Sequence, residues 1–339
     1  MKKNKNKILF IAIVIIALVI IIIDFNIGNV KIPFKSMWQF FYIFDDSFDN
    51  YYNLLKEFRF TRVFAAILAG AALSVAGLLM QTIFKNPLAD ASILGVSSGA
   101  GLGVAIVVLS SKYFLGIELQ SNIIQLVAAA IGATLVLCII LFSSIKVQDM
   151  LSVLIIGILI SGVISAIISI LQFFANNVNL KSYVLWTMGS LNGIAFNEIM
   201  LLIPIVSITL LIAFLMSKNL NIILLGENFA KTMGININFV KIIIFILVSI
   251  LTGSITAFCG PIGFIGIISP HVARWIFNTS NHFLLIPTTI LIGIIFMLFG
   301  DILSNVILKN GILPINAIIS ILGTPFILWI VITNKRTII

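Results

Sequence analysis

The chain has 339 residues, of which 61% are hydrophobic and only 9% are charged, and its formal net charge is +9. A soluble globular domain carries about 25% charged residues, so this composition excludes one and indicates an integral membrane protein. Apolar runs of about 20 residues recur along the chain, which predicts a helical bundle and excludes a transmembrane β-barrel with its alternating polarity. Because the sequence has no basic stripe interleaved with aromatic residues, we expect no nucleic-acid partner.

The first apolar run, residues 8–23, follows a cluster of four lysines between positions 2 and 7. A basic segment before an apolar run also begins secretory signal peptides. This run is longer than a usual signal, however, and no small-x-small cleavage site follows it. We therefore expect a retained membrane helix whose lysines lie in the cytoplasm.

Polar breaks divide the chain into ten predicted membrane helices. An even number of crossings would place both termini on the same, cytoplasmic side. Residues 261–273 are too few to span about 30 Å at about 1.5 Å per residue, so we expect this helix to tilt or to share its crossing with the flanking turn. The predicted helices are 8–28, 62–84, 91–110, 121–143, 150–174, 198–217, 239–258, 261–273, 283–303 and 314–333.

The distribution of charge agrees with this topology. With the N-terminus inside, twelve of the 20 lysines and arginines fall on the cytoplasmic side, but only three of the 11 acidic residues do. The inner side therefore carries the whole net charge of +9, and the outer side is close to neutral. Such an excess of cations inside is what the positive-inside rule requires.

The sequence has no signature of chemistry of its own. It lacks a nucleotide-binding P-loop, the metalloprotease and esterase motifs, and any Cys/His cluster, so we expect no catalytic residue, cofactor or bound metal. Cys138 and Cys259 lie in apolar runs without a CxxC partner, which predicts free thiols. His271 and His282 lie near helix ends, where a structural or interfacial role is the usual one.

The deep parts of the ten runs contain no Asp, Glu, Lys or Arg, and Asp301 and Glu198 lie at helix ends, where interfacial placement is expected. A secondary transporter usually buries ionisable groups near the membrane midplane as coupling sites. The sequence therefore predicts that the energy for any transport comes from a partner.

Three segments carry specific motifs. Residues 59–100 join an R-x-x-R pair and a membrane helix to an Asn-Pro turn and a Gly/Ser-rich helix, and residues 252–274 and 310–326 are rich in Gly and Pro. These motifs resemble the signatures of the iron-chelate and cobalamin permease family, the membrane subunits of binding-protein-dependent, ATP-driven importers. The resemblance runs from about residue 55 to the end of the chain.

The resemblance implies an all-α polytopic membrane protein of about ten transmembrane helices, with the type II ABC importer permease fold and an inverted repeat. We expect a single permease domain over residues 1–339, in the cytoplasmic membrane of a prokaryote. Residues 261–270 weakly resemble residues 87–98 in sequence. In the predicted topology the two segments follow turns on opposite sides of the membrane, as an inverted repeat would produce.

Residues 225–236 form a short amphipathic segment on the predicted cytoplasmic side. An acidic residue favours a helix start, and Gly234 suits a left-handed helix end. The apolar stripe of this segment is by itself typical of a helix lying on lipid. In the family, the matching G-E-x-x-A-x-x-x-G segment is the coupling region that binds one of two ATPase subunits. We therefore assign to coupling Gly226, Glu227, Phe229, Ala230, Met233 and Gly234.

Arg59 and Arg62 precede the second helix at the predicted outer face, where they could simply anchor the helix by snorkelling. The resemblance implies that they bind carboxylates of an extracytoplasmic binding protein, which suits the planar arginine fork. The chain departs from the family at Ile312, where a glutamate is common, and at Asn305, where some members have an arginine. Lys309 could supply the missing charge in docking.

Asn86, Pro87 and Leu88 form the turn after the second helix. Such a turn could be only a proline-stiffened connection between antiparallel helices. In the family it is the inner gate of the translocation path, and the loop 143–150 holds the position of a second gate, which adds Asp149 and Met150.

We therefore predict a permease subunit, not an enzyme, that works with a second permease copy or a paralogue and carries a metal chelate. The resemblance favours a ferric siderophore, with haem and cobalamin as alternatives. The rival functions are an ion-coupled secondary transporter and a membrane enzyme acting on lipid. The sequence lacks the buried charges that the first would require and the nucleophilic or metal-binding residues that the second would require.

Overall fold

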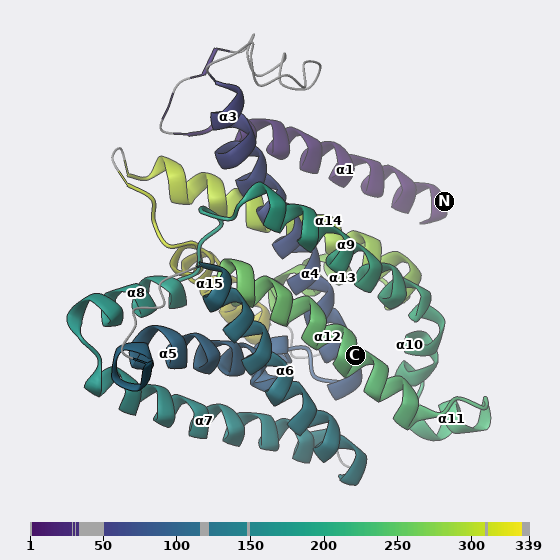
Figure 1. Ribbon diagram of the computed structural model, residues 1–339. Helices are drawn as coiled ribbons and strands as arrows, with labels where there is room; N and C mark the ends of the chain where they lie inside the picture. Colours follow the sequence, from purple (N-terminus) through teal and green to yellow (C-terminus); the bar gives the residue numbers. More distant parts are fainter. Residues whose placement is uncertain are drawn as a thin grey trace.

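The computed structural model describes residues 2–28, 30, 32–33, 51–115, 122–147, 150–308 and 311–333. Within these ranges all regular structure is helical (Figure 1). The ten main helices are α1 (Lys2–Asn26), α4 (Thr61–Phe84), α5 (Val96–Leu115), α6 (Asn122–Lys146), α7 (Met150–Phe174), α9 (Phe196–Leu215), α12 (Ile237–Cys259), α13 (Ile265–Phe277), α14 (His282–Val306) and α15 (Ile315–Thr333).

Shorter helical elements connect them. Before α4, α3 (Tyr52–Leu54) continues into a π-helical stretch, Leu55–Phe60. The others are the 3₁₀ helix Ala91–Leu94, α8 (Asn177–Thr187), α10 (Ser217–Leu224) and α11 (Glu227–Thr232).

Seven helices in the described part of the chain are long and apolar enough to cross a membrane. Two shorter apolar helices, Val96–Leu109 and Ile315–Trp329, and the 13-residue α13 complete the predicted set of ten. The all-α polytopic class is therefore confirmed. The inverted repeat stays a prediction.

One predicted helix begins later than expected. Residues 91–94 form a 3₁₀ turn that ends at Gly95 with φ of 78°, a left-handed conformation that glycine adopts without strain, and α5 starts at Val96. The sequence interpretation of a helix over 91–110 was therefore wrong at its first turn. A continuous apolar pattern does not reveal a glycine that breaks the helix.

Helix α4 is the centre of the molecule. It belongs to the apolar span Tyr52–Phe84, in whose most apolar stretch 89% of the residues are buried. Helix α4 packs against α14, α12, α13 and α9. A Cβ added at Gly70 would lie 2.5 Å from the carbonyl oxygen of Gly293 on α14, and one at Gly77 would collide with the backbone of Gly266 on α13. These small residues let the helix backbones approach closely, as is common in membrane bundles.

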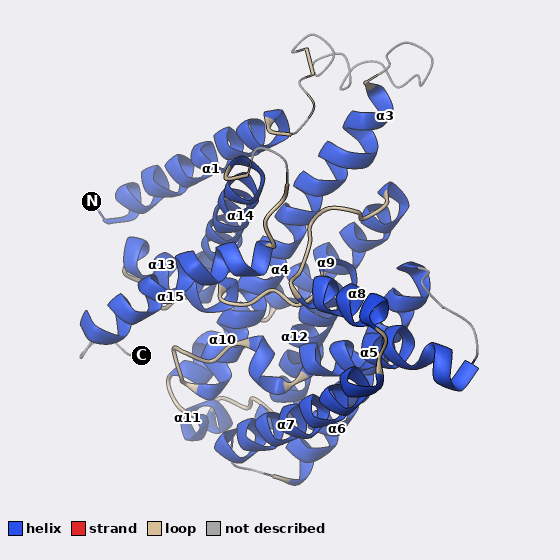
Figure 2. Cartoon of the chain, turned by 90° about the vertical axis from the view of Figure 1, so that its left-hand side faces the viewer, coloured by secondary structure: helices blue, strands red, loops and turns tan. Residues whose placement is uncertain are grey.

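The outer helices expose apolar surface. Only 28%, 17% and 22% of the residues in the most apolar stretches of α6, α7 and α1 are buried. Helix α1 lies along the outside of the bundle against α14. The two views agree in placing α3 at one end of the molecule and α11 at the opposite end (Figures 1 and 2).

Candidate functional sites at the two ends

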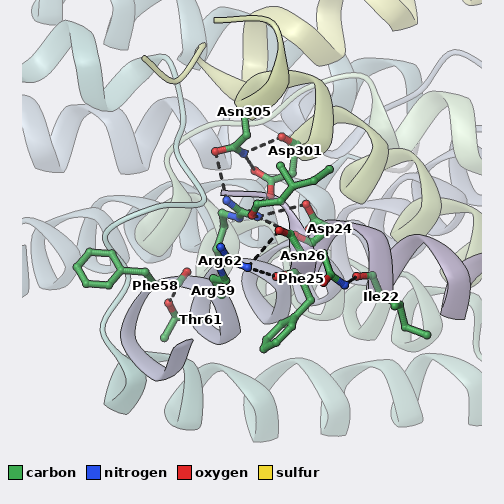
Figure 3. A network of polar contacts seen from close by, with 11 residues as sticks. Ile22, Asp24, Phe25, Asn26, Phe58, Arg59, Thr61, Arg62, Asp301 and Asn305 are labelled. Atoms are coloured by element: carbon green, nitrogen blue, oxygen red, sulfur yellow. Dashed lines mark hydrogen bonds and ion pairs between the residues drawn. The ribbon is translucent and has the colours of Figure 1, made fainter. Parts of the chain in front are cut away.

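Arg62, in the first turn of α4, is the centre of a buried polar group that we call the arginine cluster: Asp24, Arg59, Arg62, Asp301 and Asn305 (Figure 3). Its Nε atom lies 2.9 Å from Oδ2 of Asp301, and its Nη2 atom lies 3.4 Å from Oδ1 of Asp24. Nη1 donates to Oδ1 of Asn305 at 3.2 Å. One guanidinium thus joins carboxylates from α1 and α14 to α4.

Arg59 lies one turn earlier, in the π-helical stretch, and its hydrogen-bond partners among the described residues are main-chain carbonyls. Its guanidinium donates to the oxygens of Phe25 at 3.1 Å, Asn26 at 3.1 Å and Val30 at 2.5 Å. Arg62 also donates to the carbonyls of Asp24 and Ile27 at 2.9 and 2.8 Å. The last carbonyls of a helix lack intrahelical donors and carry partial negative charge, so both arginines stabilise the end of α1.

These arginines are buried, being only 5% and 4% exposed, and both bind oxygen atoms of the chain itself. Asp301, near the end of α14, is 1% exposed, and the ion pair with Arg62 compensates its burial; its placement at the membrane interface stays a prediction. Docking of a binding protein on Arg59 and Arg62 stays a prediction. Lys309, the third predicted docking residue, lies outside the described residues.

At the opposite end, residues 226–234 form the short helix that the sequence predicted. Gly226 precedes α11 with φ of 121°, and Gly234 follows it with φ of 77°, so both predicted glycines occupy conformations that other residues avoid. Ala230 is fully buried, whereas Phe229 and Met233 are 46% and 58% exposed. The helix thus lies on the protein through its alanine face and exposes an apolar stripe.

Glu227 holds this helix to the bundle. Its Oε1 atom lies 2.9 Å from Nζ of Lys241 on α12, and the Lys241 side chain is 9% exposed while that of Glu227 is 42% exposed. The sequence predicted Glu227 as a helix-start residue, and the family resemblance assigned it to coupling. The sequence did not predict its pairing with α12. The presence of Lys241 in an apolar run, close in sequence to the acidic Glu227, could have suggested this ion pair.

The turn at the end of α4 is compact. Lys85 ends the helix in a left-handed conformation with φ of 47°, and the Oδ1 atom of Asn86 accepts a hydrogen bond of 2.9 Å from the amide of Leu88. Leu88 is 40% exposed. Of the second predicted gate, Met150 begins α7, and Asp149 lies outside the described residues.

The family follows from a direct comparison. The model of the FecCD transport family matches residues 14–333 of this chain. The chain belongs to the FecCD transport family. The predicted resemblance to iron-chelate and cobalamin permeases is therefore confirmed.

Curated FecCD relatives cover most of the chain. It is 29% identical to the hemin transport system permease protein HmuU of Yersinia pestis, over 92% of this chain and 91% of that protein. It is 30% identical to the vitamin B12 import system permease protein BtuC of Citrobacter koseri, over 83% of each chain. These relatives are transport permease subunits and not enzymes, as the sequence predicted for this FecCD chain.

A solved structure shows the same fold. An inward-facing structure described as that of a metal-chelate type ABC transporter matches with a TM-score of 0.82 and 24% identity, over 97% of this chain and 99% of that chain. The type II permease fold expected of a FecCD protein is therefore confirmed. Permeases of ABC importers work with ATPase subunits and a substrate-binding protein.

Proposed function

We propose that this chain is the permease subunit that moves an iron–siderophore complex across the cytoplasmic membrane of a bacterium. The observation that carries the proposal is the family match over residues 14–333. Relatives named for hemin and for vitamin B12 make haem and cobalamin the alternative cargoes. All three are bulky chelates, which one type of path could accommodate.

The cargo is tested by competition. Proteoliposomes with the permease, its ATPase and its binding protein take up a radiolabelled ferric siderophore, and unlabelled siderophore, hemin and cobalamin are added in turn. We expect the unlabelled siderophore to compete at the lowest concentration. Competition by hemin or cobalamin at lower concentration would reassign the cargo and keep the permease function.

The path for such a chelate runs between two permease copies in our proposal. Two cavities beside the loop 188–194 have volumes of about 200 and 230 Å³, below the roughly 300–1,000 Å³ of pockets that enclose a drug-sized ligand. The exposed apolar faces of α6 and α7 offer surface that a second copy or lipid can cover. A homodimer, or a pair with a paralogue, would form the path at that contact.

Energy enters at α11 in this account. The exposed side chains of Phe229 and Met233 would bind a groove of the ATPase subunit, and Ala230 seats the helix on the bundle. Because the ion pair of Glu227 and Lys241 joins α11 to α12, a movement of the ATPase would be passed to the membrane helices. This end of the molecule, and with it the turn at 86–88, is then cytoplasmic.

The turn at Asn86, Pro87 and Leu88 is the proposed inner gate. With Asn86→Cys in both copies of a homodimer, we expect cross-linking that depends on the nucleotide state, because an inner gate closes near the dimer axis. Mass spectrometry of the cross-linked peptide identifies the pair. A verified homodimer that never cross-links in any nucleotide state would remove the gate from this turn.

Arg59 is the better docking candidate of the two arginines. Its partners are neutral carbonyls, which a carboxylate of the binding protein can displace, whereas Arg62 already pairs with two carboxylates. Asn305, at the position where some family members have an arginine, is committed to the cluster: its amide donates to the carbonyl oxygen of Asp301 at 2.8 Å. Lys309 would add a further positive charge to this face.

We expect Arg59→Glu to weaken binding-protein association, since a charge-assisted contact of roughly 1.5–3 kcal/mol is lost and repulsion is added. Arg59→Lys keeps the charge without the fork and should give an intermediate affinity. Titration of purified binding protein onto the reconstituted complex, at two salt concentrations, measures the effect. An unchanged affinity in Arg59→Glu would leave this residue with the sole role of holding α1.

A further inference from the structure

A line of buried hydrogen bonds connects α10, α14 and α4 at the α11 end of the molecule. His282, the first residue of α14, is 1% exposed. Its Nε2 atom lies 2.9 Å from Oγ1 of Thr82 on α4, and its Nδ1 atom lies 2.8 Å from Oδ1 of Asn221 on α10. We call Asn221, His282 and Thr82 the histidine bridge.

The surrounding hydrogen bonds determine the direction of each bond. The backbone amide of His282 donates to Oδ1 of Asn221 at 2.8 Å, and Nδ2 of Asn221 donates to Oδ1 of Asn281 at 2.9 Å, so the amide of Asn221 has one orientation. An oxygen facing Nδ1 requires that this ring nitrogen carries the proton. In the neutral ring, Nε2 is then an acceptor, and only the hydroxyl of Thr82 can donate to it.

Thr82 has two acceptors for its single proton. Its Oγ1 atom lies 2.8 Å from the carbonyl oxygen of Leu78, one turn earlier in α4. That carbonyl accepts the helical amide bond at the same time, whereas Nε2 of His282 has no other donor in the described structure. The bond to His282 is therefore favoured while the helices stay in place, and the bond to Leu78 is available when they separate.

The bridge joins the two parts of the chain that transport would have to connect. Helix α10 leads directly into the coupling segment 225–236, and Thr82 lies in the last turn of α4, just before the turn at residues 86–88. The neighbouring Gln81 is also bound: its Oε1 atom accepts from Arg274 at 2.6 Å, and its Nε2 atom donates to the carbonyl of Gly266 at 3.2 Å. The end of α4 is thus held by directional bonds and not only by packing.

Packing alone does not require these polar groups. A buried polar group away from water costs free energy unless it is hydrogen-bonded, and apolar residues could fill the same space. Thr289, further along α14, is buried, and its hydroxyl has no hydrogen-bond partner in the described structure. Thr289 therefore serves as a matched control for Thr82, because it is a buried threonine whose hydroxyl links no two of the described helices.

We propose that Thr82, His282 and Asn221 are positioning residues that transmit the movement of the coupling segment to the turn at 86–88. The inference rests on the proposed function, in which an ATPase binds at α11 and the turn is a gate. Directional bonds suit this task because they keep α10 and the end of α4 in register, whereas apolar contacts allow sliding.

The test follows the gate and the ATPase separately. The reporter chain carries Leu88→Cys with Cys138→Ser and Cys259→Ala, and it is reconstituted with the partner ATPase. The rate at which an impermeant maleimide labels position 88 is measured with and without ATP, together with ATP hydrolysis. Thr82→Val and His282→Asn each remove the Thr82 contact, and the asparagine can still donate to Asn221 in place of Nδ1.

In both variants we expect ATP hydrolysis within about twofold of the parent, while the ATP-dependent change in labelling falls roughly fivefold or more. The double variant should be no worse than either single one, because both remove the same contact. Thr289→Val should match the parent. His282→Gln, whose amide takes the place of Nε2, should retain more of the response than His282→Asn.

A full labelling response in both Thr82→Val and His282→Asn would overturn the bridge, and so would an equal loss in Thr289→Val. If Thr82→Val or His282→Asn fails to fold, ATP hydrolysis falls together with the labelling response, and His282→Gln decides. A response retained at normal hydrolysis supports the bridge, and a response lost at normal hydrolysis overturns it. A parent that hydrolyses ATP without any change at position 88 would overturn the proposed gate itself, and the bridge with it.

Discussion

Glu227→Arg is expected to abolish ATP-dependent uptake and to release the ATPase from the permease during co-purification. The substitution places a second cation within reach of Lys241, whose side chain is 9% exposed and loses its only ion-pair partner in the described structure. It also puts a positive charge at the first turn of α11, where the helix dipole disfavours it. The helix that presents Phe229 and Met233 should therefore leave its position.

Asn238→Arg is the matched control, because it adds the same side chain at an exposed site on the same end, outside the coupling segment. This variant should retain uptake and ATPase binding close to the wild type. Circular dichroism and size-exclusion chromatography in detergent check that both permeases are folded. Normal uptake by Glu227→Arg would remove α11 as the site where energy enters.

Arg62→Met is expected to give the largest loss of stability of any single substitution considered for this chain. It leaves the carboxylates of Asp24 and Asp301, 0% and 1% exposed, without a cation between them. Removing one partner from a buried ion pair costs about 3–5 kcal/mol, and here two acids are left facing each other. Thermal unfolding of the purified permease in detergent should show a clearly lower midpoint.

Two variants separate charge from packing. Arg59→Met leaves only neutral carbonyls unpaired, so it should destabilise by about 1–3 kcal/mol, less than Arg62→Met. Adding Asp24→Asn and Asp301→Asn to Arg62→Met removes the unpaired charges and should recover part of the loss. If Arg62→Met unfolded at the wild-type temperature, the cluster would not hold α1 to the bundle.

The ten helices could be predicted because each depends on a local apolar run bounded by polar residues. The coupling segment could be predicted for the same reason, since Gly226 and Gly234 mark the ends of a helix that lies within a few residues of them. The short helices α8 and α10 were missed because their composition is only weakly apolar, and loops with such composition are common.

The polar contacts could not be predicted, because they join residues far apart in the sequence. Arg62 pairs with residues that precede it by 38 positions and follow it by more than 200, and nothing local reveals these partners. The R-x-x-R spacing places both arginines on one helix face, which was visible, but it is equally consistent with an exposed docking site. His282 was expected to be structural, and its partners Thr82 and Asn221 became apparent only from the packing of three helices.

ATP-dependent uptake in a defined system distinguishes an ATP-driven importer from an ion-coupled transporter. Proteoliposomes containing the permease and its ATPase are mixed with the binding protein and a radiolabelled ferric siderophore, and uptake is measured with ATP, without ATP and with each partner omitted. We expect accumulation only when all components and ATP are present, with no dependence on a proton or sodium gradient. Accumulation driven by an ion gradient without ATP or the ATPase would contradict this expectation.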